Sequence, residues 1–117
     1  MNEVLQNEWK QNRQLAAGSY YTLTIIGGTS KETIQKMGQK AGFYVWFDDA
    51  LKPKQPKYRR MISDSDCVIV LIGACSHKAM WMAKHLAKEL EIPIRFSQGR
   101  GISGAFMEAA KVCYNQK

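Results

Sequence analysis

Hydrophobic and polar positions follow two periodicities along this chain, one typical of strands and one of helices. At its centre, residues 67–72 form a run of six apolar residues without a charge, and Gly73 follows at once. Such a run is too short for a helix and too apolar for a strand that faces water. It therefore predicts a strand buried on both faces, which is typical of the middle of a parallel sheet.

Three other segments have strand character, and a helical pattern follows each of the four strands. The strand segments are rich in β-branched and aromatic residues, and the helical segments repeat apolar residues every three or four positions. The expected strands cover residues 20–26, 43–47, 67–72 and 92–96. The expected helices cover about 31–41, 57–63, 76–90 and 103–114. This alternation predicts an α/β fold, a three-layer sandwich with helices on both faces of a four-stranded parallel sheet.

Right-handed crossovers and the usual change of direction after the first strand predict the strand order 2-1-3-4. Residues 2–17 precede this unit and carry apolar residues that share one helical face. We therefore expect an extra N-terminal helix in residues 1–18 and a single Rossmann-like domain in 19–117. The helix either packs on its own sheet or forms a dimer contact.

The predicted strand order places the turn after the first strand beside the turn after the third. Open α/β sheets bind their ligands at such a switch point. Gly27 and Gly28 let backbone N–H groups approach an anion at a helix N-terminus, although a tight turn alone also needs two small residues. The expected ligand-binding residues are Gly27, Gly28, Thr29, Ser30, Asp48, Gly73, Ser76, His77, Arg100 and Ser103.

Asp48 and His77 are the two members of this set with acid–base chemistry. Asp48 ends the second strand about twenty positions after the glycine pair, where dinucleotide folds place a ribose-binding carboxylate. Ordinary turn chemistry is the alternative. His77 begins a helix, where the dipole favours the neutral imidazole, and it either contacts the ligand or only completes the first turn. No carboxylate partner for a catalytic triad can be placed.

A cluster of cations supports a second function. The chain has 17 Lys and Arg against 10 Asp and Glu, a formal net charge of +7, so phosphate-bearing partners are attracted. Basic side chains with an interleaved ring suit a nucleic-acid backbone and its bases, whereas a solvated loop is the alternative. The expected nucleic-acid-binding residues are Lys52, Lys54, Lys57, Tyr58, Arg59 and Arg60.

Composition excludes several classes of protein. A 117-residue chain with 45% hydrophobic residues forms one folded domain, and no apolar run is long enough to span a bilayer. Three cysteines without a C-x-x-C spacing predict a reducing, cytoplasmic location without a disulfide framework.

Cys75, His77 and His85 complete no metal-ligand spacing, so no metal is expected and the cofactor stays unknown. Haem or metal binding and a small His-dependent hydrolase are the remaining alternatives.

Several short motifs together resemble a known family. They are Gly27-Gly28, the run 66–70, Ser76-His77 with Lys84, the run 92–94 and Gly101-Ile102-Ser103. Over about residues 21–110 the chain is similar to the bacterial domain of unknown function 2325. The resemblance implies a cytosolic bacterial protein with a Rossmann-like fold. Because the family has no established activity, the resemblance assigns no catalytic residue.

These observations predict a small binding or regulatory protein, not an enzyme, that holds a nucleotide-like, phosphate-bearing ligand at the carboxyl ends of the strands. We expect it to act as a homodimer. Nucleic-acid binding through residues 52–60 is the second interpretation.

Overall fold

The computed structural model describes residues 21–98 and 102–114. Its elements are β1 (Tyr21–Ile26), α2 (Lys31–Ala41), β2 (Phe43–Asp48), α3 (Gln55–Ser63), β3 (Cys67–Leu71), the 3₁₀ turn η1 (Ile72–Ala74), α4 (His77–Glu89), β4 (Ile94–Ser97) and α5 (Ile102–Tyr114). The helix expected over residues 2–17 lies outside the described residues, so this helix and its dimer contact stay predictions. In the part that is described, no helix has the length and apolarity that a membrane span requires.

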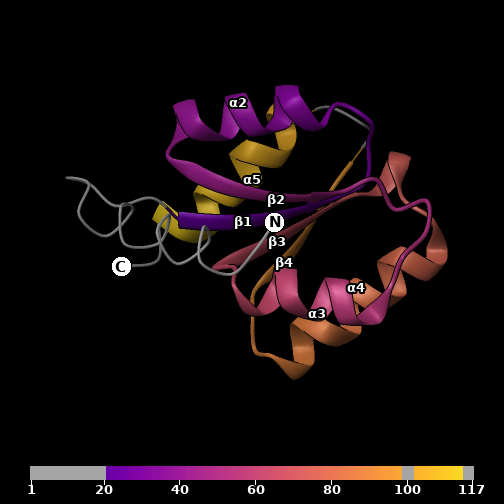
Figure 1. Cartoon of the computed structure of the whole chain (residues 1–117). Coiled ribbons are helices and arrows are strands. Elements are labelled where there is room, and N and C mark those ends of the chain that lie inside the picture. The colour runs from indigo at the N-terminus through magenta and orange to yellow at the C-terminus, as the bar shows by residue number, and fades with distance from the viewer. Residues whose placement is uncertain (1–20, 99–101, 115–117) are drawn as a thin grey trace, which may run out of the picture.

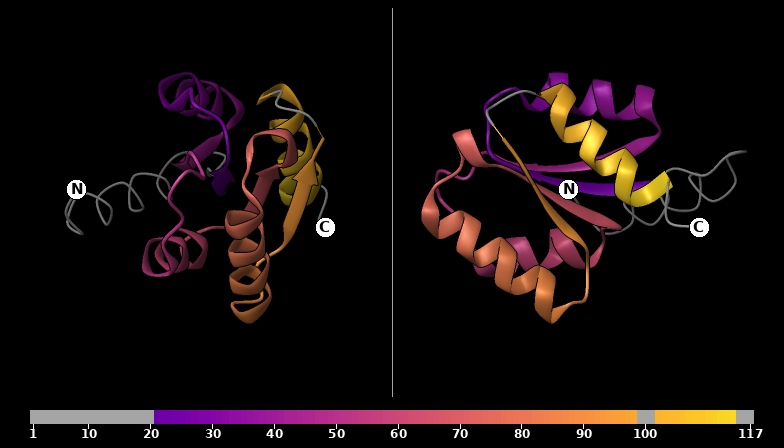
Figure 2. Two further views of the ribbon diagram at one scale, coloured as in Figure 1. Left: turned by 90° about the vertical axis from the view of Figure 1, so that its right-hand side faces the viewer. Right: turned by 180° about the vertical axis from the view of Figure 1, so that it is seen from behind.

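All four strands are parallel, in the order β2-β1-β3-β4. Leu23 of β1 pairs with Val45 on one side and Cys67 on the other. In Figure 1, α2 and α5 cover one face of the sheet, and α3 and α4 cover the other. Figure 2 shows this sheet between its helix pairs from two further directions. The predicted α/β class, strand order and coverage of both faces are therefore confirmed.

The central strand β3 supplies side chains to both cores. Cys67, Ile69 and Leu71 pack beneath α2 and α5, and Val68 and Val70 pack beneath α3 and α4. Each of these side chains is almost completely removed from solvent. Since complete burial of an aliphatic side chain is worth about 1.5–3 kcal/mol, β3 anchors both layers of the sandwich.

Element boundaries differ from the predicted ones by a few residues. β3 ends at Leu71, and Ile72 begins η1 instead of continuing the strand. Helix α3 begins at Gln55, two residues earlier than expected, with Pro56 in its first turn. Proline fits there because the first helical N–H groups have no partner within the helix.

The glycine turn after β1 lies directly against the turn after β3. Gly27 has a φ of +112°, and a Cβ atom built there would lie 2.9 Å from the carbonyl oxygen of Ala74 and 3.1 Å from that of Leu71. The Gly27 N–H also donates to the Asp48 carbonyl, at 2.8 Å. Position 27 thus contacts the turn after β3 and is hydrogen-bonded to the end of β2. Only glycine fits there, because any side chain would overlap the neighbouring backbone.

This contact predicts a strong effect of Gly27→Ala. We expect the free energy of unfolding to fall by roughly 2–4 kcal/mol, because the new methyl group combines an unfavourable φ with overlap on backbone atoms.

Gly28→Ala is the matched control. Gly28 also has a positive φ, +104°, but a Cβ atom built there would meet only side-chain atoms, at 3.7 Å or more. We expect a loss of about 1–2 kcal/mol for the control. Urea unfolding of both variants provides the measurement, and equal losses would contradict the close-contact argument.

Candidate functional site

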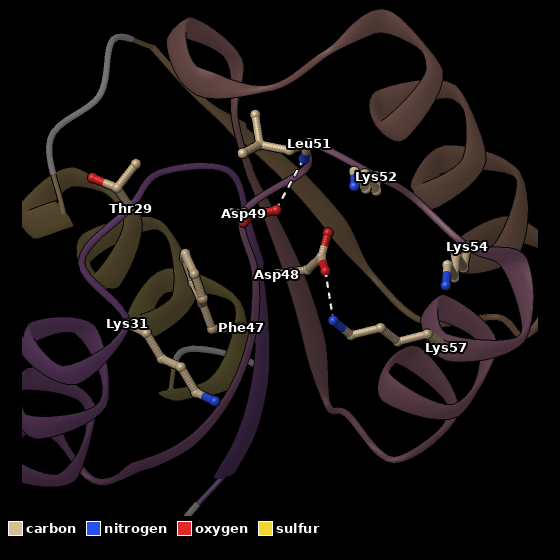
Figure 3. A pocket seen from close by; sticks show the side chains of 9 residues that line it. All are labelled: Thr29, Lys31, Phe47, Asp48, Asp49, Leu51, Lys52, Lys54 and Lys57. Carbon is tan, nitrogen blue, oxygen red and sulfur yellow. Dashed lines mark hydrogen bonds and ion pairs between the residues drawn. The ribbon is translucent and has the colours of Figure 1, made fainter.

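A large hollow lies at the carboxyl end of β2. It has a volume of about 690 Å³, within the usual range for small-molecule sites. Its walls come from the start of α2, the end of β2, the following segment and the first turn of α3 (Figure 3). The lining residues are Thr29, Lys31, Phe47, Asp48, Asp49, Leu51, Lys52, Lys54 and Lys57. We call this hollow the lysine pocket.

Lysine side chains dominate the charge of the lysine pocket. Lys31 comes from the first residue of α2, Lys52 and Lys54 from the segment after β2, and Lys57 from the first turn of α3. Figure 3 shows Lys31 and Lys57 reaching in from opposite sides. Four lysines against two aspartates leave the wall positively charged. A concave surface of one sign concentrates the electrostatic potential and attracts anions.

Asp48 forms the floor of the pocket and is only 6% exposed. Its Oδ2 atom accepts hydrogen bonds from the Tyr58 hydroxyl at 2.6 Å and from the Ala50 N–H at 2.9 Å. Its Oδ1 atom accepts one from the Lys57 ammonium at 2.7 Å. The carboxylate therefore connects the end of β2 to the start of α3.

These bonds determine the protonation of both partners. Burial acts to raise the pKa of Asp48, but the hydrogen bonds from Lys57, Tyr58 and Ala50 outweigh it and hold that pKa below its ordinary value. Burial, and then the hydrogen bond to the Asp48 carboxylate, raise the pKa of the Tyr58 phenol. Asp48 is accordingly an anion and Tyr58 a neutral donor throughout the physiological range.

The backbone of Ala50 connects Asp48 to the start of α4 through two hydrogen bonds. This residue has a φ of +67°, which is rare for a residue with a side chain and costs of order 1–3 kcal/mol. Asp48 accepts its N–H, and the Ser76 hydroxyl donates to its carbonyl at 3.1 Å. Ser76 also caps α4 by accepting from the Ala79 N–H at 3.2 Å. The Ser76 hydroxyl thus makes two hydrogen bonds within the protein.

A smaller cavity, of about 170 Å³, lies at the switch point between β1 and β3. Its volume is below the range for nucleotide-sized ligands. It is lined by Gly28, Thr29, Ser30, Ile34, Leu71, Ala74 and Ile102. Thr29 lines both this cavity and the lysine pocket, so the two hollows meet at the start of α2.

The predicted ligand residues are divided among different environments. Gly28, Thr29 and Ser30 line the smaller cavity, and Asp48 lines the lysine pocket. Five others line neither cavity. Gly27 is buried, whereas Gly73 in η1, Ser76 and His77 at the start of α4, and Ser103 in α5 are exposed. Arg100 lies outside the described residues. Neither hollow contains the whole predicted set.

The predicted nucleic-acid patch is likewise divided. Tyr58 is fully buried, so its ring cannot stack on a base. Arg59 pairs with Glu89 at 2.6 Å, and Lys57 pairs with Asp48. Lys52, Lys54 and Arg60 are exposed. Half of the expected residues are thus engaged with the protein itself.

Sequence reasoning missed other parts of the lysine pocket. Lys31, Phe47, Asp49 and Leu51 all line it, and none was expected at a ligand site. One sequence signal could have found them: Lys31 lies close to the glycine turn, and Phe47, Asp49 and Leu51 lie next to or near Asp48. Among the described residues, no three His, Cys, Asp or Glu side chains come together in a way that could hold a metal ion.

The Asp48 hydrogen bonds lead to a prediction about pH. Because the folded pKa is lowered, the carboxylate stabilises the fold fully above its ordinary value of 3.8, and this contribution disappears as pH falls through the lower, folded value. Asp48→Asn should reduce the free energy of unfolding at pH 7 by about 1–3 kcal/mol and make this free energy less dependent on pH below 4. Urea unfolding from pH 2.5 to 7 measures both effects.

Tyr58→Phe is the control for this experiment. It removes one of the three hydrogen bonds but leaves the carboxylate, so we expect a smaller loss, about 1–1.5 kcal/mol, with the acid dependence retained. An Asp48→Asn variant with the acid dependence of the unmodified protein would contradict the assigned role.

Comparisons with known proteins show the family. A family model described as an uncharacterized protein conserved in bacteria, DUF2325, matches residues 22–112. A UPF0751 protein of Desulfitobacterium hafniense strain Y51 is 38% identical over 98 residues, covering 79% of this chain and 96% of that protein. Another, of Bacillus cereus strain AH820, is 34% identical over 86 residues, covering 72% of this chain and 87% of that protein. This match over most of the fold shows that the chain belongs to the DUF2325 family of bacterial proteins.

Proposed function

We propose that this protein is a binding or regulatory protein that holds a phosphate-bearing, nucleotide-like ligand in the lysine pocket. The observation that carries the proposal is the convergence of four lysines, from two helices and the segment between β2 and α3, on one hollow at the carboxyl ends of the strands. Lysine ammonium groups form charge-assisted hydrogen bonds with phosphate oxygens.

Pocket size and composition favour a small anionic molecule. A volume of about 690 Å³ accommodates a nucleotide, and Phe47 and Leu51 add apolar surface for a ring. The two carboxylates already accept bonds within the protein, Asp48 from three donors and Asp49 from the Leu51 N–H at 3.0 Å. Their negative charges are thereby partly compensated, whereas three of the four lysines have no ion pair among the described residues.

The start of α2 provides a second source of anion affinity. Ser30 occupies the N-cap position, but its side chain accepts no hydrogen bond from the helix. The first N–H groups of a helix carry partial positive charge and attract anions. Thr29 and Lys31 bring this helix end to the wall of the lysine pocket. A phosphate group here would contact Lys31 and lie close to Thr29.

The chemistry of the wall supports binding rather than catalysis. Its described residues include no His, Cys or Ser, and Thr29 supplies the only hydroxyl. Asp48 is the buried carboxylate, but its hydrogen bonds lower its pKa and therefore weaken it as a base. His77 lines neither cavity, so ligand contacts fall to the lysines instead.

Thermal shift with pyrophosphate, AMP and ATP tests the proposal. We expect ATP at millimolar concentration to raise the melting temperature, since a ligand that binds only the folded state stabilises it. The double variant Lys52→Ala/Lys54→Ala should weaken binding about tenfold or more, because it removes two charge-assisted contacts.

Lys84→Ala/Lys88→Ala is the charge-matched control, since both of these lysines lie on α4 and line neither cavity. It should bind ATP as the unmodified protein does, and so should His77→Ala. No shift with any of the three compounds, or equal losses in both double variants, would overturn the proposal.

A further inference from the structure

Helix α4 has a solvent face on which aromatic and basic side chains lie together. His77, Trp81 and His85 follow one another at four-residue steps, and Lys84 and Lys88 fall on the same side of the helix. All five are exposed. The opposite side of α4 packs on the sheet through small and aliphatic residues. We call these five residues the α4 stripe, and the helix that carries them lies on the outside of the sandwich (Figure 2).

Trp81 is the prominent member of the α4 stripe. Its side chain is 62% exposed, although burying an indole is among the larger gains that a fold can make. The ring of His85 lies against it, with ring centroids 4.0 Å apart and planes inclined by 38°. The two rings together present an aromatic surface to solvent.

The charge of this face has one sign. Residues 77–88 contain no Asp or Glu, and Lys78 adds a further exposed cation beside the stripe. The first acid after them, Glu89, is paired with Arg59 of α3 at 2.6 Å. Cations therefore surround the exposed rings, with the adjacent acid already neutralised.

We propose that the α4 stripe binds single-stranded nucleic acid, with bases stacking on Trp81 and His85 and backbone phosphates contacting Lys84 and Lys88. Aromatic rings flanked by cations are the combination that binds unpaired strands, because every base has a face that can stack. A duplex keeps its bases stacked on one another and offers no free base face at its sides.

A second copy of the chain fits this face poorly. A two-fold symmetric contact would place the same patch on both subunits, and hence lysines against lysines. The net charge of +7 adds to that repulsion. A polyanion instead gains affinity from each lysine that it contacts and releases counterions on binding.

The site is separate from the lysine pocket and from the predicted patch at residues 52–60. That patch contains one aromatic ring, that of Tyr58, which lies on the buried side of α3. The α4 stripe supplies the exposed ring that the patch lacks. Lys52 and Lys54 lie in the segment before α3 and line the lysine pocket, so they are not part of the α4 stripe.

Fluorescence anisotropy with labelled dT15 and U15 tests the proposal. We expect binding at low salt that weakens steeply as salt rises, and weaker binding of a 15-base-pair duplex. Trp81→Ala should weaken binding about tenfold, the effect of losing one stacked base. Lys84→Ala/Lys88→Ala should reduce the slope of log affinity against log salt by about 1.4, for two phosphate contacts on a single strand.

Two variants serve as matched controls. Met107→Ala removes an equally exposed apolar side chain, 63% exposed on α5, and Lys52→Ala/Lys54→Ala removes the same charge elsewhere. Both should bind dT15 like the unmodified protein, and thermal melting should show that every variant is folded. No binding by the unmodified protein, unchanged binding by Trp81→Ala, equal affinity for the duplex, or a loss confined to the Lys52/Lys54 variant would each overturn the proposal.

Discussion

The buried carboxylate of Asp48 is the constraint on which the pocket end of this molecule depends. It holds Tyr58 and Lys57 of α3, and through the backbone of Ala50 it reaches Ser76 at the start of α4. A buried carboxylate is stable only when donors surround it, so its three hydrogen bonds fix the segment that follows β2. The part of the lysine pocket wall between β2 and α3 is therefore held in place by this one side chain.

The excess of cations is distributed over separate surfaces with different geometries. In the lysine pocket, side chains from α2, the segment after β2 and α3 converge on a hollow. On α4, Lys84 and Lys88 project from a convex helix beside two exposed rings. A concave arrangement suits a compact anion, whereas a convex strip suits an extended chain of phosphates. The same excess of positive charge therefore underlies both proposed binding sites.

Neighbouring residues in the sequence also acquire different roles. Ser76 and His77 are adjacent in the sequence, and both were expected at one ligand site. Both are exposed in the structure, but the Ser76 hydroxyl is bonded to Ala50 and to the helix that it caps, whereas His77 belongs to the α4 stripe. The strand that precedes them predicts where the turn lies, but the direction of each side chain depends on the first turn of α4.

The sequence alone determined the α/β class, the strand order and the position of the glycine turn, because these follow from burial, crossover handedness and turn chemistry, which are local or nearly so. The inward face of α3 was not predicted: Tyr58, Met61 and Ile62 recur at helical spacing, but the cations around Tyr58 favoured a nucleic-acid-binding surface instead. Only the tertiary structure decided that Asp48 would bond to Tyr58, that Lys31 and Lys52 would line the same hollow, and that half of the basic cluster would be used internally. Those contacts join segments that are separated in the sequence. How closely these segments approach one another depends on the packing of the helices on the sheet, which a local sequence pattern does not determine.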